Sequence, residues 1–108
     1  SNDYWGWGGE DDDLYNRILL AGYTISRNSA NFDRYKMFKH PRENSNDINK
    51  CRFDLLKKTK QRWKSDGISS LNYKVIRNQK RPLFTHILVD LLHEESILNL
   101  RKTFPMCF

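Results

Sequence analysis

The spacing of apolar and polar positions predicts two main helices. In the first, over residues 10–21, apolar residues recur every three or four positions behind an acidic first turn. Gly22 follows as a typical C-terminal stop. A second helix is expected over about 48–65, where Phe53, Leu56 and Trp63 lie on one arc. These segments are the natural candidates to form a core.

Stretches of alternating or β-branched residues predict strands. There are four of them: 23–27, 34–39, 71–76 and 83–91. A basic turn over 77–82 joins the last two, and the segments 28–33 and 41–49 are polar loops. The tail from His93 is expected to contain a short helix. A mixed α/β fold follows from this order of elements.

The length of the chain allows a single domain with a small core. It has 108 residues, of which 38% are hydrophobic, 13% aromatic and 30% charged, which is too rich in core-forming side chains for a disordered segment. No apolar run approaches the roughly 20 residues of a membrane-spanning helix. The two cysteines, Cys51 and Cys107, show no metal-binding spacing and leave their own redox state open.

Charge is divided unevenly along the chain. Residues 1–13 carry a net charge of −5 and the remainder +11, with 11 basic and 3 acidic residues between Arg34 and Lys64. Such a basic stripe could attract a polyanion, so a nucleic-acid-binding module is one alternative. However, no sequence pattern of a nucleic-acid-binding fold accompanies the charge, and lysines spaced along helices are commonly a solvated face.

The most unusual chemical feature is a run of four carboxylates, Glu10 to Asp13, at the start of the first predicted helix. One acidic residue there would be an ordinary helix cap, and four exceed that need. A carboxylate at this place, beside aromatic rings, can act as a general base or accept hydrogen bonds from sugar hydroxyls. Calcium binding is a weaker alternative, because the spacing of an EF-hand is absent.

Aromatic residues flanked by glycines lead directly into this acidic run. In the stretch Trp5-Gly6-Trp7-Gly8-Gly9, the glycines give the backbone freedom to present a ring to a ligand. A flat aromatic face suits the apolar face of a pyranose ring. The alternative is a buried tryptophan with a flexible approach loop.

Together these residues resemble a known family. The stretch 4–13, YWGWGGEDDD, is similar to the WGWGGEDDD signature of the β-1,4-galactosyltransferases. Further matches follow in family order at 25–27, 35–40, 52–56, 65–67, 69–73, 82–85 and 89–90. The resemblance runs from about Asn2 to Asp90.

The resemblance implies the C-terminal part of a GT-A-like nucleotide-sugar transferase fold, with a mixed sheet and two main helices. It implies an inverting transfer of galactose from UDP-galactose to the O4 hydroxyl of a terminal N-acetylglucosamine on a glycoconjugate. By the same resemblance Asp11 is the catalytic base, and Glu10 and Asp12 position the sugars. Trp7 and Gly8 belong to the small loop that closes over the sugars.

The resemblance also implies a manganese site and an acceptor pocket. Met37 and His40 correspond to two Mn²⁺ ligands, with a third ligand expected upstream of this chain. Arg52, Phe53 and Leu56 correspond to the pocket for the N-acetyl group of the acceptor. The segment 38–58 corresponds to a long lid that folds over the bound donor and metal.

The resemblance implies that residues 1–92 are an incomplete catalytic region, because the catalytic domain of the family is much longer, and that 93–108 are a C-terminal tail. The start at Ser1, without an initiator methionine, suggests a piece of a longer protein or a processed product. The 108-residue chain alone is expected to be inactive. For the full-length protein, the family implies a single-pass type II membrane protein of the Golgi lumen. An N-acetylgalactosaminyltransferase of the same family and a sugar-binding remnant remain alternatives.

Overall fold

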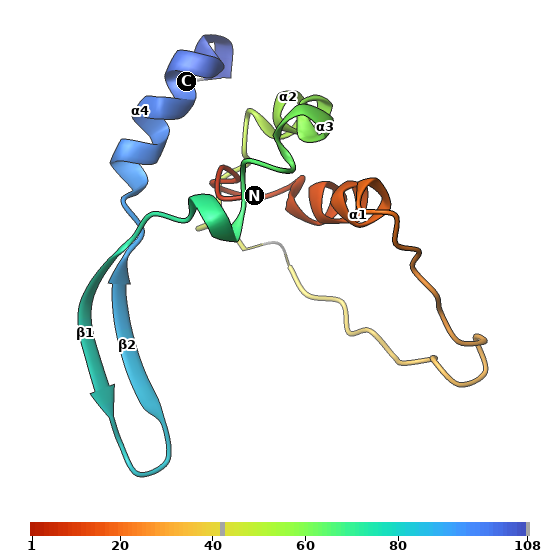
Figure 1. Cartoon of the computed structure of the whole chain (residues 1–108). Helices are drawn as coiled ribbons and strands as arrows, with labels where there is room; N and C mark the ends of the chain where they lie inside the picture. Colours follow the sequence, from red (N-terminus) through yellow and green to blue (C-terminus); the bar gives the residue numbers. More distant parts are fainter. Residues whose placement is uncertain (42, 108) are drawn as a thin grey trace.

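The computed structural model describes residues 1–41 and 43–107, and Figure 1 shows how their elements are arranged. Arg42, in the expected lid, and Phe108, in the expected tail, lie outside the described residues. In chain order the elements are α1 (Glu10–Leu20), α2 (Arg52–Lys57), α3 (Thr59–Arg62), η1 (Ile68–Ser70), β1 (Lys74–Lys80), β2 (Thr85–Asp90), α4 (His93–Thr103) and η2 (Pro105–Cys107). This confirms a small α/β fold, while the GT-A-like arrangement stays a prediction.

Helix α1 matches the helix predicted from apolar spacing, to within one residue at its end. Its N-cap is Gly9 in the left-handed region with φ 95°, and four acidic residues fill its first turn. Those negative charges lie at the positive end of the helix dipole, which favours them there. Gly22, with φ 82°, follows the C-cap, as the sequence indicated.

The second predicted helix is shorter than expected and is divided. Helix α2 begins at Arg52 rather than near Ile48, because residues 47–49 hydrogen-bond to Trp7 instead of joining a helix. The helical path is interrupted at Lys58, where φ is −96° and ψ is 4°, before α3 resumes it. Both short helices contact α1.

The sheet differs from the expected mixed sheet, since the strands of the described residues form one antiparallel hairpin of β1 and β2. The ladder runs from Lys74 opposite Asp90 to Lys80 opposite Thr85, with an irregularity between Val75 and Arg77. Strand β1 therefore continues through most of the predicted basic turn.

The predicted strands at 23–27 and 34–39 are wrong. These residues carry no strand assignment and are exposed throughout. A strand needs a neighbour to receive its backbone hydrogen bonds, and β1 and β2 use each other. The local alternation of side chains could not reveal that no partner strand lies beside them.

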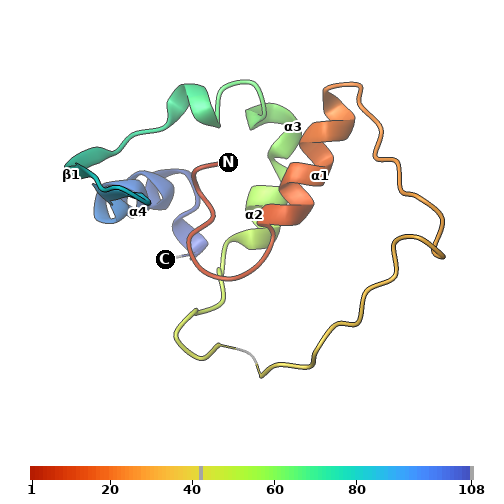
Figure 2. The same ribbon diagram turned by 90° about the horizontal axis from the view of Figure 1, so that it is seen from below.

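The core is small and depends on the C-terminal tail. Its buried apolar residues are Cys51, Leu55, Leu100, Phe104 and Cys107, against which Tyr4, Trp5 and Ile97 pack. A disulfide joins Cys51 to Cys107, so the tail is covalently attached to the start of α2. Figure 2 shows residues 1–9 passing between α4 and the α1–α2 pair.

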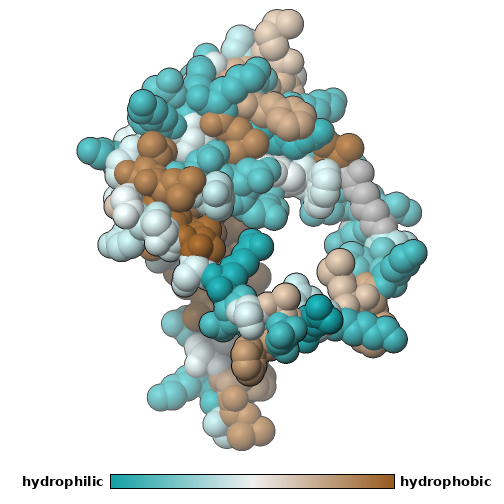
Figure 3. All heavy atoms as spheres, turned by 90° about the vertical axis from the view of Figure 1, so that its right-hand side faces the viewer, coloured by the Kyte–Doolittle hydropathy of each residue, from teal (hydrophilic) through white to brown (hydrophobic). Residues whose placement is uncertain are grey.

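The chain is spread out for its length. Its radius of gyration is 17.5 Å, whereas about 13 Å is typical of a compact domain of this size. In Figure 3 the segment between α1 and α2 bows away from the body and leaves an open gap. Among the described residues, no helix has the length and apolar character needed to cross a membrane.

Candidate functional site

The tryptophan loop is held in place by a segment far along the chain. The Trp7 N–H donates to the Asp47 carbonyl at 2.7 Å, and the Asn49 N–H donates to the Trp7 carbonyl at 3.0 Å. Gly6 has φ 88°, and a Cβ there would lie 2.6 Å from the Asp47 carbonyl oxygen. Only glycine allows this close approach without a shift of the backbone. The loop and the end of the predicted lid are therefore hydrogen-bonded to each other.

The ring of Trp7 lies at the surface rather than in the core, with 49% of the residue exposed. This is the arrangement expected of a ring that is presented to a ligand. Its neighbour Trp5 instead packs against the core. The two tryptophans of the motif thus have different environments.

The four consecutive carboxylates separate into two kinds. Glu10, Asp11 and Asp12 are exposed on the first turn of α1, whereas Asp13 is only 1% exposed. The exposed three can meet a ligand from solvent, and Asp13 cannot. Sequence reasoning did not single out Asp13, because the four residues look equivalent until the direction of α1 is known.

Asp13 is bound within a network of charged side chains. Its Oδ1 accepts a hydrogen bond from the Thr59 hydroxyl at 2.6 Å, and its Oδ2 accepts from Arg17 Nε at 2.5 Å. Arg17 also donates to Asp66 Oδ2 at 2.8 Å. The network ties α1 to α3 and to the turn after α3, and so fixes the direction in which the exposed carboxylates point.

Arg62 extends the same network to the N-terminal segment. Its Nη2 donates to Asp3 Oδ2 at 2.6 Å and to Asp66 Oδ2 at 2.7 Å. Burial would raise the pKa of Asp66, but hydrogen bonds from Ser1 and the Asn2 N–H, with the charge of Arg62, lower it below its ordinary value. For Asp3, burial prevails over Arg62 and raises the pKa.

Burial also affects Tyr4, which lies beside this network. It raises the pKa of the Tyr4 phenol, and the negative charge of Asp13 adds to the effect. The phenol therefore stays neutral at physiological pH. Its ring packs against the core next to the glycines of the motif.

Two of the three predicted acceptor-pocket residues lie beside the tryptophan loop. Arg52 approaches Gly8 and Gly9 so closely that a Cβ on either glycine would lie 3.0 Å from an Arg52 side-chain carbon. Its guanidinium carbon lies 4.5 Å from the centre of the Phe53 ring, which is 60% exposed. These two side chains therefore form a surface of one apolar ring and one guanidinium, whose Nη1 also donates to the Asn49 carbonyl at 3.1 Å.

Leu56, the third predicted pocket residue, lies elsewhere on α2. It lines a shallow cavity of about 350 Å³ against Asn16, Leu19 and Leu20 of α1. It is half-buried there. The structure thus brings Arg52 and Phe53 together with the loop and turns Leu56 toward the first helix.

Met37 and His40 lie in the exposed segment between α1 and α2, away from the tryptophan loop. Met37 is 79% exposed, and His40 Nδ1 lies 3.1 Å from the Pro41 carbonyl oxygen. That contact suits an Nδ1–H donor, which leaves Nε2 as the lone-pair nitrogen. The described residues contain no cluster of three or more histidine, cysteine or acidic residues suited to a metal.

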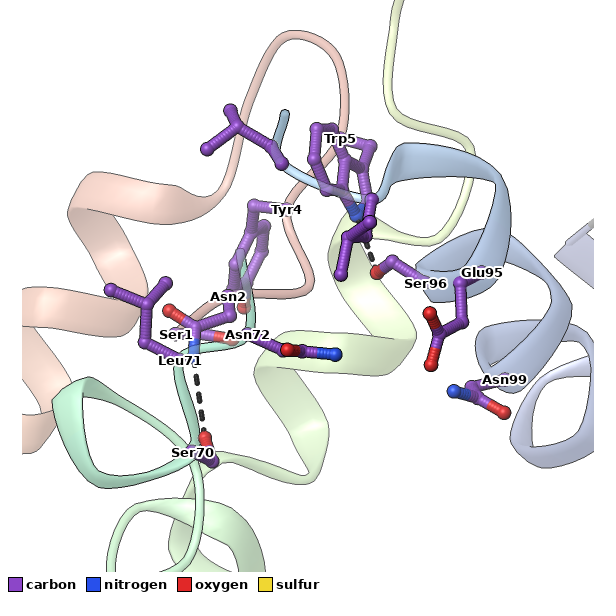
Figure 4. Close-up of a pocket in the computed structure, with 12 residues that line it drawn as sticks. Ser1, Asn2, Tyr4, Trp5, Ser70, Leu71, Asn72, Glu95, Ser96 and Asn99 are labelled. Carbon is purple, nitrogen blue, oxygen red and sulfur yellow. Dashed lines mark hydrogen bonds between the residues drawn. The ribbon is translucent and has the colours of Figure 1, made fainter. Parts of the chain in front are cut away.

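A larger cavity, of about 370 Å³, lies between the N-terminal segment and α4 (Figure 4). Tyr4 and Trp5 form part of its wall, with Leu71 and Asn72 from the segment after η1. Sequence reasoning missed this cavity, because it depends on the tail folding back onto the N-terminal segment.

The disulfide was missed for a related reason. Cys51 and Cys107 are 56 residues apart, and only two cysteines are present, so spacing carried no signal for the pair. In three dimensions their Cα atoms lie 5.2 Å apart. The tail is thereby anchored two residues beyond Asn49, which itself pairs with Trp7.

Comparisons with known proteins agree with the resemblance found in the sequence. A family model described as the N-terminal domain of galactosyltransferase matches residues 1–41. Beta-1,4-galactosyltransferase 2 of Cricetulus griseus is 50% identical over 98 residues, which are 91% of this chain and 27% of that protein.

Two human proteins give similar matches. Beta-1,4-galactosyltransferase 2 of Homo sapiens is 50% identical over 90 residues, or 83% of this chain and 24% of that protein. Beta-1,4-galactosyltransferase 1 of Homo sapiens is 48% identical over 90 residues, or 83% of this chain and 23% of that protein. The chain spans about a quarter of the length of these relatives.

Proposed function

The chain belongs to the β-1,4-galactosyltransferase family, and from that premise we propose that the protein transfers galactose from UDP-galactose to the O4 hydroxyl of a terminal N-acetylglucosamine on a glycoconjugate. The relatives named above all carry the galactosyltransferase name, which favours galactose over N-acetylgalactosamine as the donor sugar. The supporting observation is the exposed acidic turn of α1, beside the tryptophan loop and Arg52.

In the proposed reaction Asp11 is the catalytic base. Its carboxylate takes the proton of the acceptor O4 hydroxyl as that oxygen attacks the anomeric carbon of the donor. The bond between the anomeric carbon and the UDP oxygen breaks, and UDP leaves with the electron pair. A single displacement of this kind inverts the anomeric configuration. Exposure of Asp11 on the first turn of α1 makes such an approach by the acceptor possible.

The neighbouring side chains have binding roles in this proposal. Glu10 and Asp12 accept hydrogen bonds from sugar hydroxyls, and the Trp7 ring covers the apolar face of a sugar. Gly8 keeps the backbone close to Arg52, where a larger residue would meet the arginine side chain.

Arg52 and Phe53 suit the acetamido group of the acceptor. The guanidinium donates to the acetamide carbonyl, and the exposed ring packs against its methyl group. Leu56 completes this apolar wall only if α2 turns relative to α1, because it now faces the cavity beside Leu19 and Leu20.

We propose that the lid, residues 38–58, closes together with the tryptophan loop. The hydrogen bonds from Trp7 and Asn49 already join the two segments, so a displacement of one moves the other. Closure would exclude water from the reacting sugars.

His40 and Met37 are proposed as two ligands of manganese. His40 fits this role, because an Nδ1–H directed at a carbonyl leaves Nε2 for a metal. The soft thioether of Met37 fits Mn²⁺ less well, and two ligands do not complete a site. Bound there, the ion would neutralise charge on the diphosphate.

For the full-length protein we propose a Golgi-lumenal catalytic domain on a single-pass type II membrane anchor. The Cys51–Cys107 disulfide supports an oxidising compartment of this kind.

The test of the proposed function is a transfer assay with the full-length protein. With UDP-galactose, Mn²⁺ and an acceptor ending in N-acetylglucosamine, we expect a β-1,4-linked product, identified from its NMR spectrum. UDP-N-acetylgalactosamine serves as the matched donor. Absence of product, or faster transfer from the matched donor, would contradict the proposal.

A further inference from the structure

The cavity beside Trp5 contains none of the residues assigned to transfer. Its volume of about 370 Å³ falls within the range of about 300–1,000 Å³ of small-molecule sites. It is bordered by the N-terminal segment, by residues 70–72 and by α4. Helix α4 begins after Asp90, the last residue of the sequence motifs described above. The 98-residue match to the Cricetulus griseus relative nevertheless extends into this helix.

One wall of the cavity is aromatic and fixed in position. Trp5 Nε1 donates to the Ser96 hydroxyl at 2.7 Å, and the Trp5 ring meets His93 edge to face at 4.6 Å. Tyr4 stands next to it and is half-buried. Because these rings are already held, a ligand that stacks on them loses little additional side-chain entropy.

The opposite side of the cavity carries polar groups that can still form hydrogen bonds with a ligand. In Figure 4 the Asn72 side chain points across the cavity toward Glu95 and Asn99 of α4. Within the described part of the chain, neither the Asn72 nor the Glu95 side chain makes a hydrogen bond or an ion pair. The Asn99 oxygen accepts from Lys102 at 3.2 Å, which leaves its amide N–H groups as donors.

These features favour one class of ligand. Flat rings suit the apolar face of a pyranose, and amides with a carboxylate suit its hydroxyl and acetamido groups. A phosphate or an acidic sugar would be repelled by Glu95, and a lipid chain would leave the polar groups without partners. We propose that this cavity is a binding subsite for a neutral pyranose unit of a glycan, separate from the transfer site.

The tail is what forms this subsite. Leu100 and Phe104 of the tail belong to the core, and Cys107 is bonded to Cys51, so α4 is fixed against the N-terminal segment. Without the tail, Glu95, Ser96 and Asn99 would be lost and the aromatic wall would face solvent.

The experiment is an NMR titration of the ¹⁵N-labelled full chain with N,N′-diacetylchitobiose and no nucleotide sugar. We expect saturable shifts of the Trp5 indole N–H and of the Asn72 and Asn99 side-chain amides, with a Kd on the order of 1 mM. Because no donor is present, failure of this binding is distinct from failure of the transfer assay.

Paired variants separate the subsite from general effects on the surface. Glu95→Gln is expected to raise the Kd about five-fold, while Glu94→Gln, on the neighbouring position of α4, leaves it unchanged. Asn72→Leu is paired in the same way with Asn78→Leu on β1. Glucuronic acid is expected to bind more weakly than glucose.

Three results would overturn the proposal. The first is the absence of saturable shifts at about 50 mM disaccharide, well above the Kd expected for such a site. The second is equal weakening by the cavity variants and their controls, with all variants folded by circular dichroism. The third is binding of glucuronic acid as tight as that of glucose.

Discussion

The acidic turn of α1 and the segment that carries Met37 and His40 contrast in how the chain positions them. The acidic turn follows a glycine N-cap, and Asp13 at its end is hydrogen-bonded to Thr59 and Arg17. Met37 and His40 lie in an exposed stretch without helix or strand. The chain itself therefore orients the proposed base through a neighbouring helix. For the proposed metal ligands, the contact found among the described residues is that of His40 with the adjacent Pro41 carbonyl, in the same exposed stretch.

This contrast shows which functional side chains this part of the fold can hold in place without further residues. A carboxylate on a short helix is directed by contacts with the neighbouring helix. A ligand pair on an extended segment needs further residues around the metal before its geometry is defined. Substitutions in the two regions should therefore differ in their effect on stability.

Replacing both Cys51 and Cys107 with serine is expected to lower the free energy of unfolding by about 4 kcal/mol. The disulfide closes a loop between residues 56 positions apart, so its loss raises the conformational entropy of the unfolded chain. Urea unfolding of the full chain measures the change. An identical midpoint for the parent chain with and without reductant would contradict this expectation.

Asp13→Ala is expected to lower the free energy of unfolding by about 3 kcal/mol, because it leaves Arg17 Nε and the Thr59 hydroxyl without their acceptor. Asp12→Ala, one residue earlier and exposed, is the matched control and should change stability by less than about 0.5 kcal/mol. Equal effects of the two substitutions on urea unfolding would show that the acidic residues are equivalent after all.

Asp66→Asn tests the charge network through its pH dependence. The folded-state pKa of Asp66 is lowered, so its stabilisation is present above its ordinary value of 3.8 and is lost as pH falls through the lower folded-state pKa. We expect the variant to be less stable than the parent by about 2 kcal/mol at pH 7. The difference should shrink steadily below pH 4. Asp33→Asn, on the exposed segment, is the control. A stability difference between Asp66→Asn and the parent that grows as the pH falls would contradict this prediction.

Substitutions of the proposed metal ligands should have the smallest effect on folding. His40→Ala and Met37→Leu are expected to change the stability of the chain by less than about 0.5 kcal/mol, since both side chains are exposed. In the full-length protein they should raise the concentration of Mn²⁺ needed for transfer. Phe38→Leu, between them, is the control. An unaltered manganese dependence would exclude metal ligation by these residues.

Local patterns in the sequence predicted the elements whose formation depends on residues close together in the chain. Helix α1 followed from the spacing of Leu14 and Ile18 and from Gly22. The hairpin followed from two β-branched stretches, although the length of β1 was underestimated.

Features that depend on contacts between residues far apart in the sequence could not be predicted from local patterns. The pairing of Trp7 with Asp47 and Asn49 shortens the second predicted helix, and the alternation at 23–27 does not reveal that a partner strand is absent. Burial of Asp13 depends on Thr59, which lies 46 residues away. The motif predicted which residues carry chemistry, and the structure distinguished the exposed acids from the buried one.

The role of Asp11 as the base is tested most directly by Asp11→Asn in the full-length protein, assayed for galactose transfer and, separately, for binding of UDP-galactose. We expect a loss of turnover of at least about 100-fold with donor binding nearly unchanged, and an unaffected Asp33→Asn control. Retained turnover, or loss of donor binding in place of turnover, would contradict the assignment of Asp11 as the base.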